Sequence, residues 1–140
     1  MKCLPVLLVL SVFGLSAFAQ QRQFVDIFKP FGPNANAVEL SAMHRDGSGN
    51  LILGGEYVSA MDADPGAGSY VLQSTLPDAV FVVKVDAAGA LTWAVSLESL
   101  GAVYLHGIGS DGAGNIYLSG YSTDWSDLDP GPAVQMAWSA

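Results

Sequence analysis

Cysteine is almost absent from the sequence, since Cys3 is the only one in 140 residues. It stands before an apolar run from Leu4 to Phe18 that ends in the small-residue site AFA, which is the pattern of a cleaved secretory signal peptide. The run is too short to span a bilayer as a permanent helix. We therefore predict a signal peptide at residues 1–19 and a protein that is secreted or held at the cell surface. The mature chain then has no cysteine, which excludes disulfides and thiol chemistry.

Basic residues are scarce as well. The sequence has 5 Lys and Arg against 13 Asp and Glu, a net charge of −8, which becomes −9 (4 minus 13) when Lys2 leaves with the signal peptide. A field of this sign repels nucleic acid and anionic lipid surfaces, so neither is expected as a partner. Charged residues make up only 13% of the chain and hydrophobic residues 51%, which indicates a folded protein and not a disordered one.

A helical apolar period is missing from the mature chain. The 16 glycines and 7 prolines are spread along the sequence instead, which is typical of many turns between short strands. We predict strands at 38–43, 51–58, 79–85, 90–97, 103–108 and 116–121. The segments AVFVVKV and NLILGG are nearly continuously apolar, so both faces of their sheet are expected to be covered. The predicted fold class is all-β, with antiparallel sheets.

What the sequence does contain is an internal repeat. Residues 46–66 and 111–131 align without a gap at an offset of 65, with ten identities in 21 positions. The identical pairs are Asp46/Asp111, Gly47/Gly112, Gly49/Gly114, Asn50/Asn115, Leu53/Leu118, Gly55/Gly120, Asp62/Asp127, Asp64/Asp129, Pro65/Pro130 and Gly66/Gly131. A repeat of this length is typical of solenoids and propellers, whose units stack to bury their faces.

Many of the shared residues belong to expected tight turns. In the Asp-Gly-x-Gly-Asn segments at 46–50 and 111–115, glycine accepts positive φ while Asp and Asn bond nearby backbone, which predicts a hairpin. Residues 86–89, Asp-Ala-Ala-Gly, are expected to connect the strands at 79–85 and 90–97 in the same way. Each unit of about 65 residues then has four antiparallel strands.

The combined motifs resemble the bacterial β-propeller repeat called SBBP, whose pattern runs D-x-x-G-N-x-Y-x-x-G, then D-x-D-P-G, then D-x-F-x-x-K-x-D-x-x-G with a following Trp. The resemblance covers roughly residues 24–140. The last part of the pattern is occupied by Asp78, Phe81, Lys84, Asp86, Gly89 and Trp93. The resemblance implies antiparallel four-stranded blades of a β-propeller in a secreted or cell-surface protein, and it implies no reaction.

On this resemblance the chain divides into a signal peptide at 1–19, the start of a partial preceding blade at 20–37, a first full propeller repeat at 38–100 and a truncated second repeat at 101–140. Propellers typically need four to eight blades to close. We therefore expect a fragment of a longer protein whose partners are further propeller blades. The alternative is that oligomerisation or a partner chain covers the open blade faces. The end from Trp125 onward is expected to be frayed.

Two acidic turns, DADPG and DLDPG, raise the question of calcium. They place carboxylates in pairs beside a Pro-Gly turn, namely Asp62 and Asp64 beside Pro65-Gly66, and Asp127 and Asp129 beside Pro130-Gly131. Clustered oxygens suit calcium, and Asp46 with Asn50 offers a similar alternative. We favour turn capping, because the third oxygen residue and the downstream Glu of a helix-loop-helix calcium loop are missing. No other cofactor is expected.

Candidate catalytic groups are few. Ser41, His44 and Asp46 make a triad on paper, but residues 41 and 44 point to opposite faces of an extended strand because their separation is odd. His106 aligns with Ser41 and not with His44. The sequence has no His/Cys metal cluster, and GSGN and GAGN precede strands, unlike a phosphate-binding loop before a helix. We therefore expect no enzyme activity from these residues.

Aromatic residues have a structural and a functional interpretation. We expect Trp93 in the core of a blade, and Tyr121 and Trp125 packed in the core or in loops, with stacking on a glycan as the alternative. The function expected for the chain is a non-enzymatic extracellular scaffold, or a module that binds protein or carbohydrate. The alternative is a secreted propeller enzyme, a glycan hydrolase or lyase whose catalytic residues lie elsewhere. Matched acids and unmatched histidines in the two copies favour the scaffold.

Overall fold

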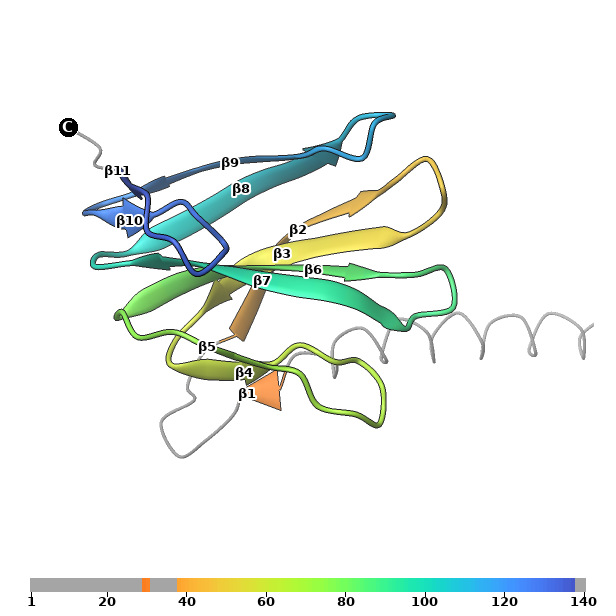
Figure 1. The fold of residues 1–140 in the computed structure, drawn as a ribbon, viewed down its shortest axis with the longest axis horizontal. Helices are drawn as coiled ribbons and strands as arrows, with labels where there is room; N and C mark the ends of the chain where they lie inside the picture. Colours follow the sequence, from red (N-terminus) through yellow and green to blue (C-terminus); the bar gives the residue numbers. More distant parts are fainter. Residues whose placement is uncertain (1–28, 31–37, 138–140) are drawn as a thin grey trace, which may run out of the picture.

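The computed structural model describes residues 29–30 and 38–137. The predicted signal peptide at 1–19 and most of the predicted partial blade at 20–37 lie outside these residues. The described part consists of strands and turns and contains no helix (Figure 1). The prediction of an all-β fold with antiparallel sheets is therefore confirmed.

Six longer strands form the framework, and short strands extend it. In the described residues the strands are β1 (Lys29–Pro30), β2 (Val38–Arg45), β3 (Leu51–Tyr57), β4 (Ala60–Asp62), β5 (Val71–Gln73), β6 (Asp78–Val85), β7 (Leu91–Ser99), β8 (Val103–Ser110), β9 (Ile116–Ser122), β10 (Ser126–Asp127) and β11 (Met136–Ala137). The six strands predicted from the sequence are confirmed, with ends that differ by no more than two residues.

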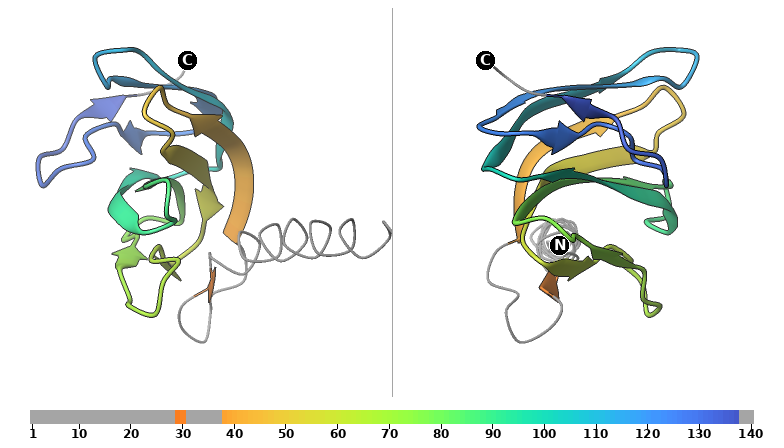
Figure 2. Two further views of the ribbon diagram at one scale, coloured as in Figure 1. Left: turned by 90° about the vertical axis from the view of Figure 1, so that its right-hand side faces the viewer. Right: turned by 60° about the vertical axis from the view of Figure 1, so that its left-hand side comes forward.

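The strands form three antiparallel sheets. The central sheet has the order β11-β10-β7-β6-β3-β2, so β2, β3, β6 and β7 are the four neighbouring strands expected of one unit. The second hairpin, β8–β9, is a separate two-stranded sheet, and β1, β4 and β5 form a third sheet. The β8–β9 hairpin and the β1-β4-β5 sheet lie on opposite sides of the central strands (Figure 2). The described sheets are open and do not close into a ring.

Both faces of β3 and β6 are covered, as their continuous apolar sequences predicted. On one face Phe81 and Val83 belong to a buried cluster that includes Met61 and Leu72 from the β4–β5 hairpin. The opposite face contributes a second buried cluster, which consists of Ile52, Val80, Val82 and, from β8, Leu105. The β8–β9 hairpin, which belongs to the second unit (described residues 101–137), therefore covers one face of the first unit (residues 38–100).

The described residues 125–137 differ from the prediction, while residues 138–140 lie outside the described part. The chain was expected to be frayed from Trp125 onward, but β10 pairs with β7 through Ser126 and Ser99. Both side chains are buried, and the Ser126 hydroxyl donates to the Ser99 hydroxyl at 2.9 Å. The strands β10 and β11 are two residues long, so no periodicity in the sequence reveals them. Their pairing depends on the edge of β7, which a local pattern does not contain.

Candidate functional site

The Asp-x-x-Gly turns are built in one way at three places. The Asp46 carboxylate accepts from the backbone N–H groups of Ser48 and Asn50, both at 2.9 Å. The backbone N–H of Gly49 donates to the Asp46 carbonyl at 3.0 Å, and Gly49 has φ +87°, a conformation that favours glycine. Asp46 thus fixes the chain reversal between β2 and β3.

The other two turns repeat this geometry. Asp111 Oδ1 accepts from the backbone N–H groups of Ala113 and Asn115, both at 2.9 Å. Gly114 and Gly89 both have φ +88°, and Asp86 accepts from the backbone two and four residues later, as in the other turns. The residues of these turns are those of the Asp-x-x-Gly motifs in the sequence. The remaining turn glycines, Gly47 and Gly112, lie in open space.

The two equivalent aspartates differ in their outer partners. Asp46 Oδ2 accepts from the Asn50 side-chain amide and forms an ion pair with Lys84 Nζ at 2.8 Å. The hydrogen bond from Lys84, followed by that from Asn50, holds the pKa of Asp46 far below its ordinary value. The Lys84 ammonium thereby ties the first hairpin turn to β6.

In the second unit the equivalent carboxylate oxygen has different hydrogen-bond partners. Asp111 Oδ2 accepts from the Asn115 amide at 2.7 Å and from the Tyr117 hydroxyl at 2.9 Å. These hydrogen bonds, the Asn115 side chain first, lower the pKa of Asp111 from 3.8 to about 2. Asp111 therefore has hydrogen-bond donors around it where Asp46 has a full positive charge.

The acidic Pro-Gly turns use their carboxylates as caps. Asp62 Oδ1 accepts from the backbone N–H groups of Asp64 and Tyr70, and Asp64 Oδ1 accepts from that of Gly66 at 2.7 Å. The equivalent bonds in the second copy run to Asp127 from the N–H groups of Asp129 and Gln135. Pro65 and Pro130 stand inside these capped loops. The geometry is that of the turn-capping interpretation.

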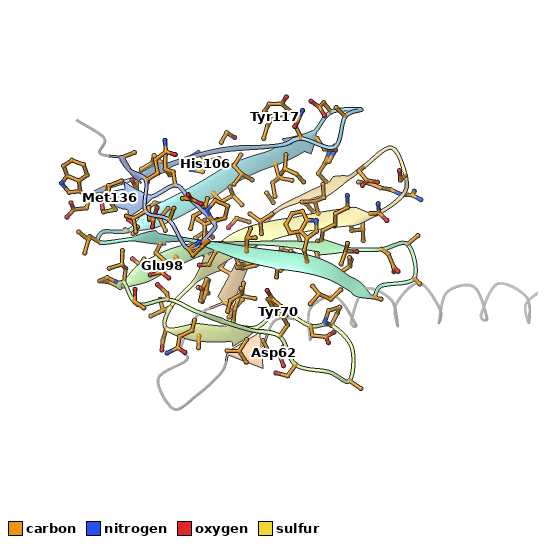
Figure 3. The ribbon with its side chains drawn as sticks, viewed as in Figure 1. Asp62, Tyr70, Glu98, His106, Tyr117 and Met136 are labelled. Carbon is orange, nitrogen blue, oxygen red and sulfur yellow. The ribbon has the colours of Figure 1, made fainter. Side chains whose placement is uncertain are left out.

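The calcium hypothesis for these aspartates stays a prediction. Asp127 and Asp129 line a polar cavity of about 260 Å³ together with Tyr70 and Glu98, and Figure 3 labels Asp62 and Tyr70 beside the β4–β5 hairpin. Within residues 29–30 and 38–137, no three His, Cys, Asp or Glu side chains come together in an arrangement that could hold a metal ion. Asp46 and Asn50 bond to each other in the first hairpin turn.

The three residues of the triad considered in the sequence each bond to a different partner. Ser41 donates to the Glu56 carboxylate, His44 Nε2 is 2.9 Å from the Ser110 hydroxyl, and Asp46 caps its turn. Ser41 is also the extra residue of a β-bulge between Leu40 and Ala42. The structure therefore joins none of the three to another in a catalytic relay.

Sequence reasoning missed the function of the last glycine in each repeat motif. A Cβ on Gly55 would stand 1.8 Å from the Glu39 carbonyl oxygen, and one on Gly120 would stand 2.1 Å from that of Tyr104. Both approaches occur where a bulge, at Ser41 or at the equivalent His106, shifts the partner strand. The repeated Gly at the end of the motif, which the alignment did show, is the signal of this bulge.

A cleft lies between the first unit and β8, where the two repeats contact each other. It has a volume of about 390 Å³ and is lined by Glu39, Ser41, Glu56, Asp78, Tyr104 and His106 among others. Glu56 bridges it, because one carboxylate oxygen accepts from Ser41 and the other from the backbone N–H of Leu105. Glu56 therefore clips β8 to the first unit.

Beyond this cleft the second hairpin presents an aromatic surface, the tyrosine face, which we define as Tyr104, Tyr117 and Tyr121. Tyr104 and Tyr121 are stacked with ring centroids 4.9 Å apart, and His106 meets Tyr121 edge-on at 5.4 Å. Tyr117 lies at the turn end of β9 and His106 towards the other end of the hairpin (Figure 3). All three tyrosines are exposed. Tyr121 was expected to be packed, so its exposure corrects that expectation.

The two described tryptophans differ, because Trp93 packs against the core and Trp125 does not. Trp93 is half-buried and packs against the cluster that contains Ile52 and Val82, close to the expected core position. Trp125 was expected to pack in the core or in a loop, and it is exposed, while its carbonyl accepts from the Leu100 N–H at 2.9 Å. The strand β10 fixes the backbone here without burying the indole ring.

Comparison with protein-family models, with curated proteins and with solved structures finds no match for this chain. Among the described residues no helix is long and apolar enough to cross a membrane.

Proposed function

We propose that this chain is a non-enzymatic repeat module of the β-propeller type, exported from the cell, which acts as a scaffold by stacking its units face to face. The bacterial SBBP repeat is the family that its motifs favour. The partners are further units of the same kind or a protein chain that offers an equivalent surface. The following contacts support the proposal.

The single observation that carries it is the contact between the two units within this chain. Leu105 and Ile108 of β8 lie directly over Gly54 of β3, where an added Cβ would meet their side chains at 2.5 and 2.9 Å. Ile52, beside Gly54 on the same face, is fully buried. One unit thus covers the face of the other, and this is the contact that a repeat array multiplies.

The tyrosine face is the surface at which the next contact of this kind would form. Tyr117 stands at the position equivalent to Ile52, and Tyr121 at that of Glu56, the residue that clips β8. Tyr117 is 59% exposed where Ile52 is fully buried. Exposed tyrosines supply contact area at low entropy cost and are enriched in protein interfaces. We therefore assign the face to a protein partner and not to a glycan.

A test is to extend the array by one unit in register. Position 140 is equivalent to position 75, so a chain in which a second copy of residues 76–140 follows Ala140 continues the repeat without a break. We expect its urea midpoint and its m-value to exceed those of the original chain, because stacked repeats unfold as one cooperative array. The control carries the same added residues in shuffled order.

An extended chain that unfolds at the midpoint of the shuffled control would contradict the proposal.

A further inference from the structure

The outer edge of β9 differs from that of its equivalent, β3. β3 pairs with β2 on one side and with β6 on the other, over the whole length of the strand. Among the described residues β9 pairs with β8 alone. An exposed strand edge presents backbone N–H and C=O groups that can receive another strand. The first unit therefore shows which kind of strand fits the edge of the second.

The register of that strand follows from the first unit. Val85 pairs with Leu51, Phe81 with Gly55 and Ala79 with Tyr57. The offset of 65 carries Gly55 to Gly120, so an incoming strand like β6 places its phenylalanine opposite Gly120.

A cavity lies where this phenylalanine would go. In the first unit Phe81 belongs to one buried cluster with Tyr57, Met61, Ala63 and Leu72. The equivalent residues of the second unit, Ser122, Ser126, Leu128 and Ala137, all line one apolar cavity of about 400 Å³, together with Leu118 and Gly120. The residues at the equivalent positions of the second unit thus surround an open space, with the smaller Ser122 and Ser126 where the first unit has Tyr57 and Met61.

The charge at the turn end is complementary as well. Lys84 of β6 forms its ion pair with Asp46, which caps the turn next to β3. Asp111 caps the equivalent turn next to β9, and its outer oxygen bonds the Tyr117 hydroxyl and the Asn115 amide. A lysine three residues after the incoming phenylalanine would reach Asp111 in the way that Lys84 reaches Asp46.

An apolar groove continues from the cavity between β7 and β9. It has a volume of about 340 Å³, and its lining includes Trp93, Val95 and Leu97 from β7 and Ile116 and Leu118 from β9. Leu118 is partly exposed there, while its equivalent Leu53 is fully buried. We therefore expect a two-stranded segment, and not a single strand, to fill both the cavity and this groove.

We propose that the outer edge of β9 binds a β-hairpin with the residue pattern of this chain's own β6–β7 hairpin, Asp-x-Phe-x-x-Lys-x-Asp-x-x-Gly and a Trp. The hairpin belongs to a further repeat unit, its phenylalanine enters the 400 Å³ cavity, and its lysine pairs with Asp111. This inference rests on the repeat-array part of the proposed function and names the segment that the edge accepts.

The test offers that hairpin in trans to the intact mature chain. A synthetic peptide of residues 78–99, blocked at both ends, is titrated into the isotopically labelled chain while backbone amide signals are followed by NMR. We expect saturable shifts at 116–122 and at Asp111. A peptide with Phe81→Ala should bind at least about tenfold more weakly, because a buried aromatic anchor is lost.

Charge variants check the register independently of the aromatic anchor. With the chain variant Asp111→Asn, which retains the turn-capping oxygen, binding of the unmodified peptide should weaken about two- to fivefold and become less sensitive to salt. The matched control is the chain variant Asp86→Asn, in the turn that joins β6 to β7. This variant should leave the affinity for the unmodified peptide unchanged. A Lys84→Gln peptide should lose no further affinity for the Asp111→Asn chain.

Shifts confined to 51–57 would mean that the peptide replaces the native β6 on β3, and they would overturn the proposal. The absence of shifts at 116–122 at millimolar peptide would overturn it as well. These outcomes are separable from failure of the proposed function, because the in-register extension can stabilise the chain through the tyrosine face even when the free hairpin does not bind.

Discussion

The strands β3 and β9 follow the same kind of turn and pair across the same kind of bulge, but their surroundings differ throughout. Leu53 of β3 is fully buried, and the equivalent Leu118 of β9 is 39% exposed. The difference comes from the neighbours, because β3 lies between β2 and β6 under β8, while β9 pairs with β8 alone among the described residues. The repeat motif therefore specifies a hairpin, and burial depends on the strands that other segments supply.

The largest expected effect concerns the bulge glycines. Gly55→Ala places a Cβ against the Glu39 carbonyl, and we expect a loss of about 4 kcal/mol of unfolding free energy, at the upper end for one substitution. Gly120→Ala makes the equivalent clash with Tyr104 in an exposed hairpin that can shift, so its cost should be about half as large. Urea denaturation of the variants measures both.

Gly47→Ala is the matched control, because its Cβ would meet nothing within 4 Å. Its cost should stay within about 0.5 kcal/mol. Equal losses for Gly55→Ala and Gly120→Ala would show that the two hairpins are equally constrained.

The buried and exposed leucines give the next effect in size. Leu53→Ala removes a fully buried side chain and should cost about 3 kcal/mol, from lost burial and the cavity left behind. Leu118→Ala removes the same atoms from a partly exposed site, and we expect a loss of about 1 kcal/mol or less. If denaturation gave the same loss for both, the open space beside β9 would not exist in solution.

The smallest effect is electrostatic and depends on pH. The pKa of Asp111 is lowered from 3.8 to about 2 and that of Asp46 further still, mainly by Lys84, so both carboxylates stabilise the folded state above pH 4. Their contributions decline as the pH falls below 4, and that of Asp111 is lost near pH 2. Asp46→Asn should therefore reduce the change in urea midpoint between pH 6 and pH 2 more than Asp111→Asn does. The reverse order would contradict the assignment of Lys84 to Asp46.

Much of this arrangement could be predicted from sequence, because the hairpin turns depend on residues close together in the chain. The Asp46, Asp86 and Asp111 turns and the six long strands are local features of this kind. The bulges at Ser41 and His106 were not predicted, although Gly55 and Gly120 mark them, because a bulge depends on the partner strand. The pairing of β10 with β7 was not predicted either, since two residues carry no periodicity.

The tyrosine face shows the same limit for the site. Tyr121 and the Glu56 clip acquire their positions from the way β8 packs across the first unit, and no spacing in the sequence encodes that packing. The interpretation of Asp62, Asp64, Asp127 and Asp129 as capping residues was accessible, because each accepts from backbone N–H groups within its own short loop.

Amide hydrogen exchange on the intact mature chain is the most direct measurement of the difference between the units. Amides of residues 51–57 should exchange at least about tenfold more slowly than those of 116–122, because in the described part of the chain β3 is bonded on both sides and β9 on one. Equal protection of the two segments, independent of protein concentration, would contradict the claim that the second unit has an open edge.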